Sequence, residues 1–522
     1  MFKNHPKGLL GAALANMGER FGFYIMMAIL TLFISAKFGL DEKTTGYIYS
    51  AFYASIYLLA LVGGVIADKT RNYKGTILWG LLIMALGYVV IAIPTPTPVP
   101  HFALYLALTC FGLLIIAFGN GLFKGNLQAL VGQMYDNASD DVKARRDAGF
   151  QIFYMFINIG GFFAPWIAIA VRNWWLKVNG FDYNAALPEL CHKFLDGKIT
   201  GVEMDNLQVL ADKVVLSGDT VTEMNTFVNS YLDVFNQGFH YAFFATTFAI
   251  AISVVIYLAN KKTFPNPADR VVANNNNSEK TAVSKEEIKM NITEIRQRIY
   301  ALFAVFGVVI FFWLSFHQNG YSLTYFARDY VNLDVIKINL GFTTIKGAEI
   351  FQCVNPFFVV ALTPLIMWLF GALKKKGKEP STPMKIGIGM GIAALAYVFL
   401  VIFSLALPAK ETLGTMSEAD LNLMRVTPLI MVGLYFILTV AELFISPLGL
   451  SFVSKVAPPH LQGLMQGCWL AATAVGNSLL FIGGILYTSV PIWACWLVFV
   501  GATGASMLVM LSMVKWLERV TK

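Results

Sequence analysis

Charged side chains are scarce in this 522-residue chain. Aspartate, glutamate, lysine and arginine together make up 13% of it, about half of the roughly 25% that is typical of soluble proteins. Apolar residues, tyrosine included, make up 57%. A soluble fold cannot cover this much apolar surface, and a disordered chain would be far more polar. Most of the protein is therefore predicted to be solvated by lipid.

Cysteine and the common catalytic motifs are also scarce. There are five cysteines, four of them inside apolar runs and only Cys191 in a polar stretch, so no disulfide framework or metal-ligand spacing is present. The sequence has no nucleophile elbow, H-E-x-x-H motif or P-loop, which disfavours a membrane enzyme and an ATP-driven pump. We expect neither a cofactor nor a metal ion. The first seven residues lack the layout of a signal peptide, so the first helix is expected to stay in the mature protein.

Long apolar runs dominate what is present. A bilayer core of about 30 Å requires about 20 apolar residues per helix. Twelve runs meet this length, and together they predict an all-α polytopic membrane protein. They cover residues 8–35, 45–68, 76–94, 102–135, 147–171, 239–260, 299–327, 348–373, 385–407, 428–452, 464–488 and 491–514.

The positions of lysine and arginine predict the orientation. If the N-terminus is cytoplasmic, the short basic segments between the runs fall mainly on the inside, as the positive-inside rule requires. Both termini are then cytoplasmic, in a multi-pass protein of the plasma membrane (the inner membrane if bacterial). The net charge of +8 is thereby explained as an orientation signal, and no nucleic-acid partner is predicted.

Two long polar segments divide the chain. Residues 173–238 form an insertion on the outside, in which 187–195 and 222–235 are amphipathic and are expected to form short helices. Residues 261–298 are expected to be a cytoplasmic linker. The linker separates a six-helix half (1–260) from a second six-helix half (299–522). This is the layout of a major facilitator fold, with a substrate site between the halves near the middle of the membrane.

Ionisable residues at membrane depth each cost about 2.5–3.5 kcal/mol or more, so each one needs an explanation. Glu19 and Arg20 lie in the middle of the first run. Neighbouring side chains on a helix diverge by about 100°, so we expect both to find partners on other helices; the alternative is a pair that only fixes packing. Lys124 lies in the fourth run and either faces the cavity or reaches out to the cytoplasmic surface.

Two further titratable residues belong to the second half. Glu442 is central in the tenth run, with no basic residue between Arg425 and Lys455. An isolated buried carboxylate is expected to meet a cation supplied by a ligand. His317, in the seventh run, is either a proton carrier or a neutral packing residue.

Aromatic and amide side chains complete a predicted wet cavity with a cationic end and an anionic end, which suits a zwitterion. Each aromatic residue taken alone would more often be a packing residue. The candidates on the runs are Tyr24, Tyr57, Tyr154, Asn158, Asn355 and Trp469.

Several motifs match a known family. Residues 63–68 read G-G-V-I-A-D, 153–160 read F-Y-M-F-I-N-I-G, 352–356 read Q-C-V-N-P, and 442–450 read E-L-F-I-S-P-L-G-L. Trp469 and the pair 476–477, G-N, follow in the eleventh run. Together these motifs make the chain resemble the proton-coupled oligopeptide transporter family of the major facilitator superfamily.

The resemblance implies a role for each matching position. Glu442 would bind the peptide amino terminus, and Arg20 and Lys124 would supply positive charge for the carboxylate end and for proton coupling. Asn158 and Asn355 would bond the peptide backbone. The residues expected to line the side-chain pockets are Tyr24, Tyr57, Tyr154 and Trp469. The implied partners are small peptides, protons and the lipid bilayer, and the protein is expected to be a monomer.

Three departures from the family pattern concern proton coupling. Asn16 replaces the first carboxylate of E-x-x-E-R-F, Met27 replaces an arginine, and His317 replaces a glutamate. Coupling is therefore expected to run through Glu19 and His317, with Arg20 and Lys124 in the same network. The predicted function is import of di- and tripeptides by proton symport with alternating access. Altered or absent coupling, or another small zwitterionic or anionic solute, is the alternative; a sensor without transport would need a signalling domain.

Overall fold

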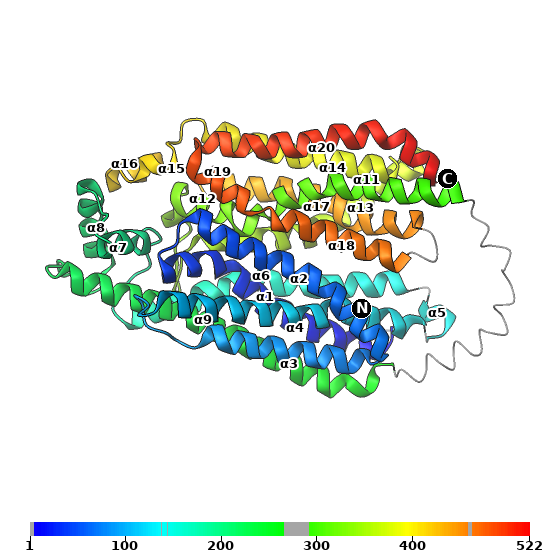
Figure 1. The fold of residues 1–522 in the computed structure, drawn as a ribbon, viewed down its shortest axis with the longest axis horizontal. Helices are drawn as coiled ribbons and strands as arrows, with labels where there is room; N and C mark the ends of the chain where they lie inside the picture. Colours follow the sequence, from blue (N-terminus) through cyan, green and yellow to red (C-terminus); the bar gives the residue numbers. More distant parts are fainter. Residues whose placement is uncertain (1–4, 137, 144, 266–291, 458–461, 522) are drawn as a thin grey trace.

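The computed structural model describes residues 5–136, 138–143, 145–265, 292–457 and 462–521. Within this part of the chain, twelve helical segments are long and apolar enough to cross a membrane, which confirms the predicted all-α polytopic fold. They run roughly along the long axis of the molecule (Figure 1). The six spans of the first half are α1 (Gly8–Phe38), α2 (Glu42–Thr70), α3 (Tyr73–Ala92), α4 (Phe102–Asp136), α6 (Arg146–Val178) and α9 (Met224–Asn260).

Three spans of the second half are interrupted. The seventh is α11 (Ile292–Phe316), a 3-10 turn η2 (His317–Gly320) and α12 (Ser322–Tyr330). The eighth starts as the 3-10 turn η4 (Ala348–Cys353) before α13 (Val354–Lys375), and the eleventh is α18 (Gln462–Ser478) followed by α19 (Phe481–Ser489). The remaining spans are α14 (Thr382–Ser404), α17 (Leu429–Val456) and α20 (Ile492–Thr521).

The short elements gather at the two ends of the bundle. The end that we call the insertion end carries α7 (Leu187–Leu195), α8 (Gly201–Val214), η3 (Leu333–Ile336), β1 (Ile338–Asn339), β2 (Thr344–Ile345), α15 (Lys410–Leu413) and α16 (Glu418–Met424). The opposite, terminal end carries both chain termini, α5 (Asp140–Lys143) and η1 (Lys261–Thr263). Most of the predicted 261–298 linker lies outside the described residues.

The predicted helices of the insertion are only partly correct. The helix expected at 187–195 is α7, but the one expected at 222–235 is not a separate short helix, because residues 224–235 are the beginning of the long span α9. The rings of Phe227, Tyr231 and Phe235 stack along this part of α9, and Tyr183 packs on the ring of Phe235 at 5.8 Å. These contacts bury one helical face beyond the membrane, so the helix continues. The helix α8, not expected from the sequence, starts at a capping box of Thr200 and the residue Glu203.

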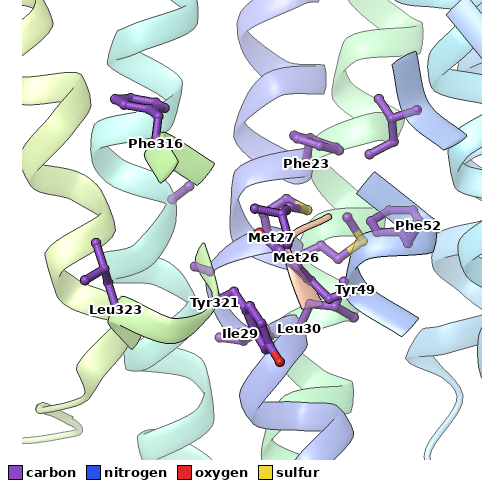
Figure 2. Close-up of a cluster of buried hydrophobic side chains, with 14 of the residues drawn as sticks. Phe23, Met26, Met27, Ile29, Leu30, Tyr49, Phe52, Phe316, Tyr321 and Leu323 are labelled. Carbon is purple, nitrogen blue, oxygen red and sulfur yellow. The ribbon is translucent and has the colours of Figure 1, made fainter. Parts of the chain in front are cut away.

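Close packing joins the two halves on the side of the insertion end. The Tyr321 hydroxyl fits between Gly46 of α2 and Gly484 of α19, where a Cβ atom would lie within 2 Å of it. The ring of Tyr321 stacks on that of Tyr49 at 5.7 Å, beside the buried apolar side chains of α1 (Figure 2). Small residues thus let an aromatic side chain of one half enter the other.

Candidate functional site: a cavity between the two halves

A cavity of about 110 Å³ lies between the halves, and it contains both predicted and unpredicted side chains. Five of the predicted substrate-binding residues line it: Tyr24, Tyr154, Asn158, Asn355 and Glu442. The polar residues that sequence analysis did not single out are Tyr49, Tyr53, Asn319 and Gln352. Asn319 reaches the cavity because the seventh span is broken at η2.

Glu442, on α17, provides the negative charge of this cavity. One of its carboxylate oxygens accepts a hydrogen bond from Asn355 Nδ2 at 2.8 Å, and Asn355 also donates to Thr439 Oγ1 at 3.0 Å. Among the described residues, no lysine or arginine nitrogen lies within 4 Å of this carboxylate. Glu442 is therefore held in place by an amide, and its charge has no cationic partner, as the sequence predicted.

Glu19 and Arg20 form a pair with each other, so the expectation that both would look to other helices instead is wrong for Arg20 and only partly right for Glu19. Arg20 Nη2 donates to Glu19 Oε1 at 2.6 Å, and Arg20 Nε contacts Glu19 Oε2. The two side chains are long enough to turn back toward each other in spite of the 100° between their Cβ directions. Glu19 is fully buried and also accepts a hydrogen bond from Asn120 Nδ2 of α4 at 2.9 Å. An amide within an apolar run was the only sequence signal for Asn120.

Lys124 follows Asn120 one turn later on α4 and remains without an ionic partner. Its Nζ lies 4.5 Å from the centre of the Tyr57 ring, and no carboxylate oxygen of a described residue lies within 4 Å of it. A cation–π contact of this kind leaves the charge available. Within the described residues, the first half thus holds both a paired cation, Arg20, and a lysine, Lys124, whose ammonium group has no carboxylate within 4 Å.

His317 is the first residue of η2 and lies behind the cavity wall. Its Nδ1 is 2.5 Å from Asn477 Oδ1 of α18. Its ring lies 4.7 Å from that of Tyr53, which lines the cavity, and 4.9 Å from that of Trp313. His317 is therefore connected to the cavity through the ring of Tyr53.

Four predicted substrate-binding residues lie outside the cavity lining: Arg20, Tyr57, Lys124 and Trp469. Arg20 and Lys124 belong to the polar groups described above, and Tyr57 carries the Lys124 contact. Trp469 is buried in α18, with its ring 6.2 Å from that of Phe306 and tight against Gly449. The substrate-binding roles of these residues stay predictions.

A larger cavity of about 420 Å³ continues from the same site toward the terminal end. It shares Tyr154 and Asn158 with the first cavity and runs between α6 and α13 to Met367 and His5. Its walls are mostly apolar side chains. Tyr154 and Asn158 thus border both cavities, of which the larger reaches toward the end that carries the termini.

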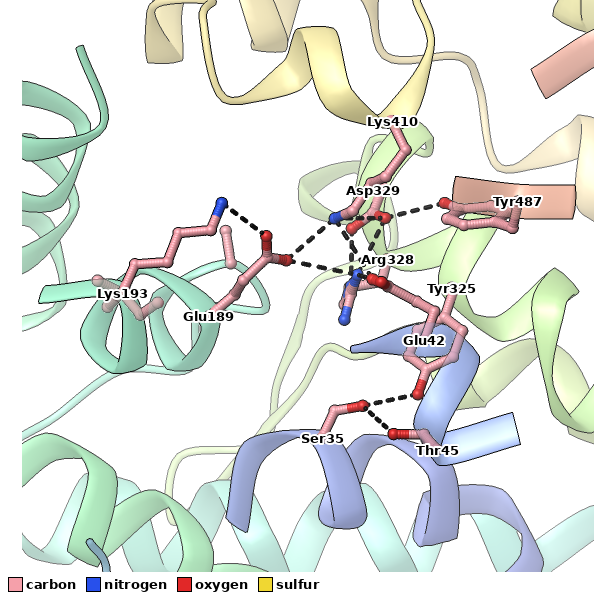
Figure 3. A network of polar contacts seen from close by, with 12 residues as sticks. Ser35, Glu42, Thr45, Glu189, Lys193, Tyr325, Arg328, Asp329, Lys410 and Tyr487 are labelled. Atoms are coloured by element: carbon pink, nitrogen blue, oxygen red, sulfur yellow. Dashed lines mark hydrogen bonds and ion pairs between the residues drawn. The ribbon is translucent and has the colours of Figure 1, made fainter. Parts of the chain in front are cut away.

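An ionic cluster closes the opposite side, and it was not predicted (Figure 3). Its members come from both halves and from the insertion: Glu42 of α2, Glu189 of α7, Arg328 and Asp329 of α12, and Lys410 of α15. Arg328 Nη2 lies 2.6 Å from Glu42, and Lys410 Nζ lies 3.0 Å from Glu189 and 3.2 Å from Asp329. A second ion pair between the halves, Arg172 with Glu349, is fully buried.

Charges of opposite sign within the cluster outweigh burial at its extramembrane members Glu189 and Lys410. Burial acts to raise the pKa of Glu189, but Lys410 and Arg328 outweigh it and hold that pKa well below its usual range. Burial acts to lower the pKa of Lys410, yet Asp329 and Glu189 hold it above its usual range. Both groups are thus charged at neutral pH.

Comparison with known proteins identifies the family. The model of the POT family matches residues 74–271 and 266–490. The chain belongs to the POT family. It is 28% identical to a peptide transporter of Yersinia enterocolitica over 91% of this chain and 87% of that protein. Identity to a dipeptide and tripeptide permease A of Cronobacter turicensis is 27%, over 88% and 80%.

A solved structure has the same fold. The crystal structure of a peptide transporter POT in complex with sulfate superposes with a TM-score of 0.70, at 24% identity, over 100% of this chain and 96% of that one. The POT-family chain described here therefore has the major facilitator fold that its twelve spans and two polar segments predicted.

Proposed function

We propose that this POT-family protein is a secondary active transporter that imports di- and tripeptides by alternating access between its two halves. The observation that carries the proposal is the carboxylate of Glu442 in the cavity between the halves, which has no cationic partner among the described residues and is positioned by Asn355 at 2.8 Å. A peptide ammonium group is the cation that this carboxylate lacks. Lys124 of the other half supplies a free positive charge for the peptide carboxylate.

The relatives support this substrate class. Proteins named as a peptide transporter and as a dipeptide and tripeptide permease match nearly the whole chain. The cavity also fits the chemistry, because amides and tyrosine hydroxyls can bond a peptide backbone whatever side chains it carries. Charged ends and an adaptable middle are what short peptides have in common.

Proton symport is proposed to run through Glu19, with His317 as a second carrier. Glu19 is held by Arg20 and Asn120, and protonation of Glu19 would release the guanidinium. The alternative is altered or absent coupling, and a specific observation favours it: position 16, one turn before Glu19, is a buried amide that cannot titrate.

The orientation is also a proposal, with both termini in the cytoplasm. A cysteine introduced in the insertion, at Val209 of α8, should react with an impermeant maleimide on intact cells, because Val209 is 54% exposed. A cysteine at Lys376, at the end of α13, should react only after lysis. The opposite result would reverse the orientation.

Labelled dialanine uptake into proteoliposomes, with and without an inward proton gradient, tests the function. Accumulation above the equilibrium level with the gradient supports symport. Equilibration that ignores the gradient identifies a facilitator, and absence of any dialanine uptake or counterflow rules out the peptide proposal. An N-acetylated dialanine is the matched control, since it keeps the carboxylate and loses the ammonium group.

A further inference from the structure

The connection between the seventh and eighth spans contains a short β-hairpin with an apolar tip. Strands β1 and β2 pair Ile338 with Ile345, and the turn between them is closed by a hydrogen bond from Leu340 N to Thr343 O at 2.9 Å. Residues 338–345 contain no charged side chain. Leu340 is 50% exposed and Phe342 is 66% exposed, although this segment lies at an end of the bundle where polar residues would be expected.

Hydrogen bonds to α6 fix the position of this hairpin along the axis of that helix. Thr343 Oγ1 donates to Ala170 O at 2.7 Å, and Asn173 Nδ2 donates to Thr344 O at 2.6 Å. Lys177 Nζ donates to Gly341 O at the turn itself. The turn therefore lies beside the last helical turn of α6.

The same helix presents its lipid-facing stripe next to the hairpin. Apart from Tyr154, which lines the cavities on the opposite face, the exposed large apolar residues of α6 are Phe163, Ile167, Trp174 and Val178, which fall on one face at 100° per residue. Positions 170, 173 and 177, which hold the hairpin, fall on the adjoining face. Trp174 lies one turn before the end of the helix, the position at which tryptophan marks a membrane interface.

We propose that the tip of this hairpin, Leu340 and Phe342, inserts into the interfacial layer of the bilayer at the insertion end. The lipid-facing stripe of α6 continues directly into the tip, so the same bilayer surface covers both. Apolar side chains that reach about 5–10 Å into the headgroup and acyl boundary are a recognised way of anchoring a segment to a membrane.

The charged side chains next to the hairpin indicate whether its insertion requires anionic lipids. The lysines that flank the hairpin are both paired: Lys337 Nζ lies 2.8 Å from Asp182, and Lys346 Nζ lies 2.5 Å from Asp334. These two lysines add no excess positive charge, and Lys177, which has no carboxylate within 4 Å among the described residues, is held at the turn by the Gly341 carbonyl. Insertion is therefore driven by apolar contact and takes place in a zwitterionic bilayer.

The anchor has a consequence for the movement of the halves. By sequence the hairpin belongs to the second half, but its hydrogen bonds attach it to α6 of the first half. The chain continues from β2 through Lys346 into η4, which carries Glu349, the partner of Arg172. A tip held in the bilayer keeps this junction at a constant depth while the halves move.

Spin-label accessibility tests the inference without requiring transport, so it stands or falls separately from the peptide proposal. Cys110 and Cys468, the cysteines that are not buried, are replaced by alanine, and a nitroxide is attached at position 342 by Phe342→Cys. Position 163 serves as the lipid-facing control, and Leu423 of α16, 85% exposed, as the water-facing control. Each protein is reconstituted in phosphatidylcholine vesicles and its relaxation by oxygen and by a water-soluble nickel chelate is compared.

We expect the label at 342 to relax several-fold more with oxygen than with nickel, as at 163, and the label at 423 to show the reverse. A label at Leu340 should repeat the result and guards against a local distortion at 342. Relaxation dominated by nickel at both tip positions would place the tip in water. Dipolar broadening between labels at 342 would show that a second copy covers the tip, and either result would overturn the inference.

Discussion

The two halves of the molecule build the cavity in different ways. In the first half, the spans that face it are continuous helices, and the buried carboxylate of Glu19 is paired with Arg20 and Asn120. In the second half, spans seven and eight, which contribute to the lining, are interrupted, and among the described residues the carboxylate of Glu442 has an amide partner and no cationic one. In the first half, Glu19 and Arg20 thus neutralise each other, and Lys124 has no carboxylate partner among the described residues. In the second half, the carboxylate of Glu442 is available to bind a cation.

This difference indicates how a zwitterion would be oriented. A ligand with an ammonium group at Glu442 and a carboxylate toward the cations of the first half would contact both halves at once. Binding would then favour the conformation in which the halves are close around the site, and a ligand shifts an equilibrium by its differential affinity for the two states. The contrast between the halves is therefore the basis of the proposed mechanism.

The largest expected effect concerns the buried ion pair that joins the halves. Arg172→Met leaves Glu349 buried and without its guanidinium partner, which typically costs about 3–5 kcal/mol. Thermal unfolding in detergent should show a large loss of stability. Arg172→Met combined with Glu349→Gln removes both charges and should recover much of the loss; a single variant as stable as the parent would contradict a contribution of this pair.

Removing the open charge of the second half should have the next largest effect. Glu442→Gln keeps the shape and the Asn355 contact but loses the charge that would meet the peptide ammonium group. A lost buried charge contact costs about 2–5 kcal/mol, so dialanine binding should weaken by about 30-fold or more. Glu418→Gln, at a carboxylate already paired with Arg425 at 3.3 Å, is the control and should bind normally. Affinity within about twofold of the parent for Glu442→Gln would contradict the assignment.

The network of the first half should affect coupling more than binding. Glu19→Gln should lose uptake driven by a proton gradient but keep peptide counterflow, which requires no net proton movement. His317→Gln should show a smaller loss, because His317 does not line the cavity itself and reaches it through the ring of Tyr53. Accumulation by both variants equal to that of the parent would mean that coupling, if present, uses other groups.

The sequence predicted the features that depend on apolar content and on isolated charges. The twelve spans and the isolated charge of Glu442 follow from the cost of polar groups in lipid, and the part of the chain that the structure describes contains both. The interruption at η2 could not be predicted, since it accompanies the fit of Tyr321 between Gly46 and Gly484, residues distant in sequence.

The features that were predicted wrongly or missed depend on contacts between side chains, which local sequence patterns do not determine. Residues 222–235 were predicted to be a separate helix because their polarity marked them as outside the membrane, but α9 already begins at Met224 and aromatic contacts run along it. The pairing of Glu19 with Arg20 depends on side-chain rotamers, which the helical period does not determine. The ionic cluster at the insertion end joins five residues from four helices and had no local motif.

The smallest expected effect concerns that cluster. Because its cations hold the pKa of Glu189 below its usual range, Glu189 contributes stability that is present at neutral pH and lost as pH falls below about 4.3, the unfolded value. The side chain is 39% exposed, so the contribution should stay below about 1 kcal/mol. Glu189→Gln should lower the thermal stability slightly at pH 7 and reduce its decline between pH 5 and 3. If the thermal stability of the variant declined between pH 5 and 3 as much as that of the parent, Glu189 would not contribute to the pH dependence of stability.

One measurement tests the central claim most directly, namely that Glu442 of the second half binds the peptide amino terminus. Binding of dialanine and of N-acetylated dialanine is measured for the parent and for Glu442→Gln, which gives a four-value cycle. Acetylation should weaken binding by about 30-fold or more in the parent and by only a few-fold in the variant, since the two groups act through one contact. Equal losses on acetylation in both proteins would show that the ammonium group binds elsewhere, and would contradict the account.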